Sequence, residues 1–140
     1  MIGILIITHG TLGESLIHCA SHMLNKRPPR LRQLGVTAQD DLLLLAPQAR
    51  ALVKDLDEGD GVLILTDMYG GSPSNIAAKL VIPGKVEAVA GVNLPMLVRA
   101  LTYREQSLQT IVTKAVSGGC EGVIRVPPAL ATVHNAAAGN

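Results

Sequence analysis

Two stretches of the sequence decide the fold: MIGILIITHG at residues 1–10 and GVLILTDMYGGSP at residues 61–73. Each is a short apolar run that ends near a polar residue able to take part in acid–base or nucleophilic chemistry. This residue is His9 in the first stretch and Asp67 in the second. Continuous runs of Ile, Leu and Val are typical of strands that helices cover on both faces. The two stretches therefore predict two buried strands of a parallel sheet, each ending in a reactive side chain.

The segments around these strands alternate between helical and extended patterns, which predicts a parallel sheet with helices on both faces. We expect a flavodoxin-like, doubly wound α/β fold in which the parallel strands are ordered 2-1-3-4. Helices are expected within residues 11–25, 40–61, 72–81, 93–103 and 107–119, and further strands within residues 31–38, 85–92 and 122–126.

The length of 140 residues suits one domain, expected over residues 1–126, with residues 127–140 (PPALATVHNAAAGN) as a disordered tail. The net charge of +1 does not provide the excess of positive charge that is typical of proteins that bind nucleic acid. The N-terminal apolar run is too short to span a membrane, so we expect no direct membrane insertion. The two cysteines, Cys19 and Cys120, are too few for a fold stabilised by a set of disulfide bonds. We therefore expect a reducing compartment, the cytoplasm.

The apolar pattern also predicts how the helices face. In the first helix the inward stripe is expected to include Leu12, Leu16, Cys19, Ala20 and Met23. Other expectations concern helix ends: Ser72 and Asn93 are expected to cap the helices they precede, and the pair Gly118–Gly119 is expected to stop the last helix. Leu43 and Leu44 are expected to point away from the core, which suggests a surface covered by a second subunit.

The strand order predicts that His9 and Asp67 meet. In open parallel sheets, binding and active sites lie at the carboxyl ends of the strands, at the point where the strand order reverses. Strands one and three flank that point. A carboxylate that accepts the proton of one imidazole nitrogen leaves the other nitrogen free as a nucleophile. Two helix starts lie beside the pair, at Gly10–Thr11 and at Gly71–Ser72, and both are expected to bind phosphate. The combination suggests a histidine that carries a phosphoryl group.

Three stretches, IITHG, GVLILTDMYGGSPSN and GVNLPML, resemble in this order the IIA domain of the mannose-type (mannose, fructose and sorbose) bacterial sugar phosphotransferase system. The likeness runs from Met1 to about Val126. It implies a phosphotransferase, without cofactor or metal, that forms a covalent phosphohistidine. In such a protein the phosphoryl group comes from the phosphocarrier protein HPr and passes to a IIB component.

The resemblance also assigns roles to single residues. His9 matches the phosphorylated histidine, Asp67 matches the acid that hydrogen-bonds it, and Ser72 lies in the turn beside the phosphate. Tyr69, Asn93 and Met96 fall in motifs expected to contact partner proteins. The resemblance further implies a homodimer in which the terminal strand GVIRV (residues 122–126) is exchanged between subunits and pairs antiparallel to the partner's sheet.

Four other interpretations stay open from the sequence. A flavin-binding electron carrier is disfavoured because two tyrosines are the only aromatic residues. A response-regulator receiver would need paired acids after the first strand to hold Mg²⁺. A metal site on Glu14, His18 and His22 lacks a further ligand nearby in the sequence. The chain reads as a free-standing IIA, so a regulatory switch, in which phosphorylation of His9 controls a partner without sugar transfer, is the main alternative.

Overall fold

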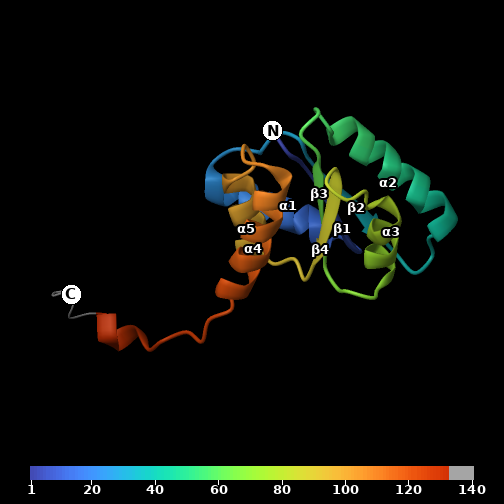
Figure 1. Ribbon diagram of the computed structural model, residues 1–140. Helices are drawn as coiled ribbons and strands as arrows, with labels where there is room; N and C mark the ends of the chain where they lie inside the picture. The colour runs from blue at the N-terminus through green and yellow to red at the C-terminus, as the bar shows by residue number, and fades with distance from the viewer. Residues whose placement is uncertain (133–140) are drawn as a thin grey trace.

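The computed structural model describes residues 1–132 and has the predicted architecture (Figure 1). Four parallel strands form one sheet in the order β2-β1-β3-β4, which confirms the predicted order 2-1-3-4. The strands are β1 (Gly3–His9), β2 (Leu31–Val36), β3 (Val62–Thr66) and β4 (Val86–Ala90). The helices are α1 (Leu12–Leu24), α2 (Leu42–Leu56), α3 (Ser72–Leu80), α4 (Leu94–Thr102) and α5 (Leu108–Glu121), followed by a 3₁₀ turn at Ala129–Thr132.

Helices cover both faces of the sheet, so the central strands β3 and β1, the latter up to Thr8, are buried, while the edge strands β2 and β4 are partly exposed (Figure 1). Because successive side chains of a strand point to opposite faces, β1 divides its residues between two cores. Ile4 and Ile6 join the core formed with α1, α4 and α5, whereas Leu5 and Ile7 join the core formed with α2 and α3. The same alternation continues to His9, the last residue of β1, and determines the face of the sheet on which its side chain lies.

Helix α1 is rotated relative to the prediction. Its buried residues are Gly13, Ile17 and Ala20, while Cys19 and Met23 are exposed. The reason is a close approach to the sheet: a Cβ atom on Gly13 would lie 3.0 Å from Thr8 Oγ1 and 3.2 Å from Ile6 Cγ2. The helix therefore packs through its small residues, and Leu12 is turned outward as well.

Helix α5 does not stop at its paired glycines but continues through Gly118 and Gly119 to Glu121. These glycines let α5 lie against α4. A Cβ atom on Gly118 would lie 2.8 Å from Arg99 Cβ, and one on Gly119 would lie 2.7 Å from Met96 Cε. The expectation that the glycines end the helix was wrong because close contact with α4 requires them there.

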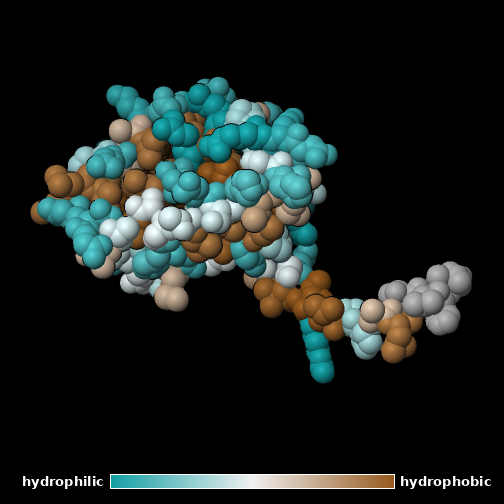
Figure 2. All heavy atoms as spheres, turned by 180° about the vertical axis from the view of Figure 1, so that it is seen from behind, coloured by the Kyte–Doolittle hydropathy of each residue, from teal (hydrophilic) through white to brown (hydrophobic). Residues whose placement is uncertain are grey.

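After α5 the chain leaves the body of the molecule, and residues 123–128 form no strand (Figure 1). Val123, Ile124 and Val126 are 70–85% exposed and form a hydrophobic protrusion between the body and the residues drawn in grey (Figure 2). The predicted strand at 122–126 is therefore absent from the single chain, and its pairing with a second subunit stays a prediction. Residues 129–132 form a helical turn where a disordered tail was expected, and residues 133–140 lie outside the described part.

The buried side chain of Arg104 connects the amino ends of β1 and β2. Arg104, 5% exposed, donates from Nε and Nη2 to Ile2 O, from Nη2 to Arg30 O, and from Nη1 to Pro29 O. Burial lowers the pKa of its guanidinium, which nevertheless stays protonated at physiological pH. Arg104 thus connects the segment that follows α4 to the residues that precede β1 and β2.

Replacing this arginine should weaken the fold. Arg104→Met keeps much of the volume but removes the guanidinium donor from three backbone carbonyls, of which Arg30 O keeps the N–H of Ile4, and this should reduce the free energy of unfolding by about 2–4 kcal/mol. Urea unfolding followed by circular dichroism measures the change. Arg50→Met on the exposed face of α2 is the matched control and should alter stability by less than about 0.5 kcal/mol. Equal losses in both variants would contradict this role for Arg104.

Candidate functional site

The structure brings His9 and Asp67 together at the carboxyl edge of the sheet. His9 is the last residue of β1, and Asp67 directly follows β3, the neighbouring strand. The His9 Nδ1 and Asp67 Oδ2 atoms are 2.8 Å apart, and the same oxygen accepts the His9 backbone N–H at 2.9 Å. The other carboxylate oxygen, Oδ1, accepts the N–H of Met68 at 2.9 Å. Three hydrogen bonds therefore fix the carboxylate.

This geometry selects one form of the imidazole ring. An ionised carboxylate can only accept hydrogen bonds, so the Nδ1 atom of His9 carries the hydrogen. In the neutral ring the lone pair is then on Nε2. The His9 side chain is 54% exposed while that of Asp67 is 14% exposed, so solvent and partner molecules can reach the ring more easily than the acid that holds it. The pair presents a nucleophilic nitrogen at the surface.

Opposing effects act on the Asp67 carboxyl. Partial burial raises its pKa, but the hydrogen bonds from the His9 backbone and ring and the attraction to that ring together outweigh burial. The net result is a pKa below the ordinary value for aspartate. Asp67 is thus ionised throughout the physiological range, as an acceptor for Nδ1–H must be.

The start of α3 lies directly beside the reactive nitrogen. A Cβ atom on Gly71 would lie 3.0 Å from Cε1 and 3.5 Å from Nε2 of His9. Gly71 is the N-cap of α3, so the predicted cap at Ser72 is wrong by one residue, and Ser72 begins the helix. The N–H groups of Ser72 and Ser74 have no acceptor within the helix, and Pro73 has no N–H. The helix start next to Nε2 therefore offers backbone donors and a positive dipole to an anion.

The turn from β1 to α1 is fixed by Gly10, which the prediction included, and by Thr8 and Gly35, which it did not. Gly10 has a positive φ of 55° and donates to Val36 O at 2.8 Å. A Cβ atom on Gly35 would lie 2.3 Å from Gly10 O, so only glycine fits there. The buried hydroxyl of Thr8 accepts the N–H of Gly13 at 2.8 Å. In the sequence, the only indication of this role for Thr8 is that it is a polar residue at the end of an apolar strand.

The remaining predicted residues divide into exposed and structural ones. Thr11 is exposed and is the N-cap of α1, without a side-chain capping bond. Tyr69 is 86% exposed beside the site and can meet a partner protein. Asn93 caps α4 by accepting the N–H of Met96, and its Nδ2 donates to Gly119 O at 3.1 Å. The prediction that Met96 contacts a partner is wrong, because Met96 is 4% exposed and packs in the core.

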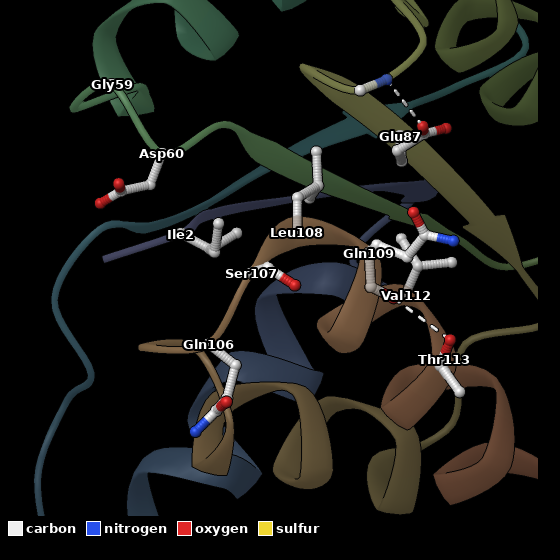
Figure 3. A pocket seen from close by; sticks show the side chains of 11 residues that line it. Ile2, Gly59, Asp60, Glu87, Gln106, Ser107, Leu108, Gln109, Val112 and Thr113 are labelled. Carbon is white, nitrogen blue, oxygen red and sulfur yellow. Dashed lines mark hydrogen bonds between the residues drawn. The ribbon is translucent and has the colours of Figure 1, made fainter.

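A pocket of about 630 Å³ lies away from this pair, at the amino end of the strands (Figure 3). Its walls come from the start of β1, the turn before β3, the start of β4 and the first half of α5. Glu87, one of its residues, accepts the N–H of Gly84 at 3.0 Å. The lining contains neither histidine nor cysteine, so the His9–Asp67 pair is the better candidate for covalent chemistry.

Two further tests concern membranes and metals. Within residues 1–132, no helix combines the length and the apolar composition needed to cross a bilayer. The same residues contain no cluster of three or more His, Cys, Asp or Glu side chains that could hold a metal ion. His18 and His22, weighed above as metal ligands, are exposed on α1.

Comparisons with known proteins identify the family of the chain. The family model described as "PTS system fructose IIA component" matches residues 3–116. The chain is 36% identical over 125 residues to the "PTS system mannose-specific EIIAB component" of Escherichia coli (strain K12), covering 87% of this chain and 38% of that protein. It is 31% identical over 106 residues to the "PTS system fructose-specific EIIA component" of Bacillus subtilis (strain 168), covering 75% and 72%.

A solved structure confirms the fold. The mannose/sorbose specific IIA subunit from Enterococcus faecalis superposes with a TM-score of 0.80 at 22% identity, covering 91% of this chain and 96% of that one. The present chain spans only 38% of the length of the Escherichia coli relative. The match of the family model and the similarity to these relatives confirm the resemblance seen in the sequence.

The lowered pKa of Asp67 predicts how the site responds to acid. An unfolded aspartate titrates near pH ~3.9, and a folded pKa below that value means that ionised Asp67 stabilises the fold at higher pH. This stabilisation is lost as the pH falls through the folded pKa. The stability difference between wild type and Asp67→Asn, measured by urea unfolding, should therefore shrink as the pH falls below about pH 4. A difference that grows in acid would contradict the assignment.

Proposed function

The chain belongs to the mannose-type family of IIA components of the sugar phosphotransferase system, and from this membership we propose that His9 is its phosphorylated residue. The observation that carries the proposal is the 2.8 Å contact between His9 Nδ1 and Asp67 Oδ2. It leaves Nε2 as the nucleophile, on the side of the ring where α3 begins. The proposed activity is transfer of a phosphoryl group through a covalent phosphohistidine.

In the proposed reaction the lone pair of His9 Nε2 attacks the phosphorus atom of the donor. A bond forms between Nε2 and phosphorus while the bond from phosphorus to the donor's leaving atom breaks, and the electron pair of that bond stays with the donor. The ring becomes positively charged on substitution, and Asp67 stabilises that charge through the Nδ1–H bond. Onward transfer reverses these changes toward the next acceptor.

The phosphoryl oxygens would be held mainly by backbone donors. We propose that the N–H groups of Ser72 and Ser74, together with the Ser72 hydroxyl, bind the phosphate at the start of α3. Gly71 supports this role because any larger residue would press on the His9 ring. Gly10 and Thr11, at the turn into α1, are proposed to line the opposite side of the group.

The donor is proposed to be the phosphocarrier HPr and the acceptor a IIB component. The name of the Escherichia coli relative, an EIIAB component, supports a IIB acceptor because that protein combines both parts. Tyr69, which is highly exposed beside the site, is proposed to contact these partners. The transferred group would thus pass between proteins before it reaches a sugar.

We propose that the protein works as a homodimer that exchanges residues 122–126. This segment has no partner strand in its own chain, and three of its five side chains are exposed and apolar. Within residues 1–132, β3 is the only strand that pairs with β4, and on the outer edge of β4 only Val86 is engaged, in an antiparallel bridge with Ile82. An edge strand and an unpaired extended segment of this composition are complementary. An antiparallel strand from a second copy would satisfy both.

Phosphorylation should depend on His9 and on no other histidine of the described chain. Incubation with phosphoenolpyruvate, the general phosphotransfer enzyme and HPr should give one acid-labile, base-stable phosphate on His9, mapped by mass spectrometry. His9→Ala should abolish the label because the nucleophile is gone. His18→Ala, which removes another exposed histidine on α1, is the matched control and should be labelled like wild type. Label retained in His9→Ala would disprove the assignment.

The dimer should depend on the exchanged segment. Ile124→Asp places a charge where the proposed strand would be buried, so light scattering should show a monomer or an aggregate in place of the dimer. Leu130→Asp, equally exposed but beyond the segment, should leave the dimer intact. A wild-type protein that is monomeric at micromolar concentration would contradict the proposal.

A further inference from the structure

Two leucines in the first turn of α2 are exposed where a helix would ordinarily carry polar residues. Leu43 is 77% exposed and Leu44 is 65% exposed, while the next residue, Leu45, is buried at 5%. The core contacts of α2 come from Leu42, Leu45 and later residues, so the two exposed leucines between them contribute little to folding. Adjacent exposed leucines of this kind mark a surface used for binding.

These leucines lie at the same edge of the sheet as the reactive histidine. Val36, the last residue of β2, is aligned with His9 in the register of the two strands, and it accepts the N–H of Gly10. Five residues later Asp41 caps α2, so the first turn of α2 rises from this edge. Helices α2 and α3 cover the same face of the sheet, and both begin at the reacting edge (Figure 1).

The charges at this edge have one sign. Four described segments surround the site there: residues 9–14, 37–44, 67–75 and 91–95. Together they contain Glu14, Asp40, Asp41 and Asp67, and these segments include neither lysine nor arginine. A phosphoryl group on His9 would add a further charge of about −1.5 to −2. The reacting edge is therefore acidic, and a partner that approaches it is favoured if it is basic.

We propose that residues 37–44, here called the α2 lip, are a docking surface for the protein that donates the phosphoryl group. The partner that fits presents an apolar patch for Leu43 and Leu44, surrounded by lysine or arginine that face Asp40, Asp41 and Glu14. Such a partner also brings to the phosphate the cation that the four segments lack. The proposal rests on the proposed function, which makes His9 the acceptor.

A second copy of the chain fits the α2 lip less well than a donor does. The lip borders the edge where a donor and an acceptor must each reach His9, and a permanent subunit there would narrow that access. The segment proposed for exchange leaves from the end of α5, on the opposite side of the sheet from α2 (Figure 1). Acidic residues on both copies would also repel each other across a shared interface.

The test compares two pairs of substitutions. The double variant Leu43→Ser/Leu44→Ser removes the apolar part of the lip. The control double variant Met23→Ser/Ile82→Ser removes two exposed apolar side chains that lie outside the four segments around the site, at the end of α1 and in the turn before β4. Phosphorylation of each protein by phosphorylated HPr gives KM and kcat, phosphoramidate serves as a small donor that needs no docking, and light scattering gives the oligomeric state.

We expect the lip variant to raise KM for the protein donor about 10- to 100-fold, with kcat within about twofold of wild type. Its reaction with phosphoramidate and its oligomeric state should be unchanged, the control variant should resemble wild type, and the wild-type KM should rise with salt. An unchanged KM, an equal rise in the control, or a changed oligomeric state would overturn the docking surface. Wild type that accepts phosphate from neither donor would instead refute the proposed function.

Discussion

The hydrogen bond between His9 Nδ1 and Asp67 Oδ2 is the interaction on which the rest of the site depends. It requires that two residues 58 positions apart in the sequence stand at the ends of neighbouring strands, and the strand order 2-1-3-4 provides this by placing β1 beside β3. It also requires an acid that stays ionised, and the low pKa of Asp67 meets that condition. The bond then determines which ring nitrogen is free.

The direction of the ring follows from the alternation of side chains along β1. Leu5 and Ile7 point toward α2 and α3, so His9, two residues further, points to the same side. Thr8 lies on the opposite side, where its hydroxyl accepts the N–H of Gly13 and holds the start of α1. Consecutive residues thus perform separate tasks, one facing the phosphate site and one anchoring the turn. Glycine at 35 and 71 keeps space for the turn and for the ring.

The sequence predicted those features that depend on patterns spread over many residues. Apolar runs and their alternation with helices sufficed for the strand order and for the meeting of His9 with Asp67. Contacts between single atoms were not predictable: the rotation of α1 follows from the fit of Gly13 against Thr8, and the continuation of α5 follows from the fit of Gly119 against Met96. The burial of Met96 could not be seen either, because a motif shared with a family does not distinguish packing from binding.

A phosphate site without lysine or arginine suits a protein that passes the phosphoryl group on better than a protein that retains it. A phosphate bound by lysine and arginine within one protein would be stabilised there, and that stabilisation would have to be overcome in the next transfer. Around His9 the four loop segments supply backbone donors, a helix dipole and carboxylates instead. The favourable charges would then arrive with each partner and leave with it. The phosphoryl group would be stabilised chiefly while two proteins are in contact, which is when transfer in either direction occurs.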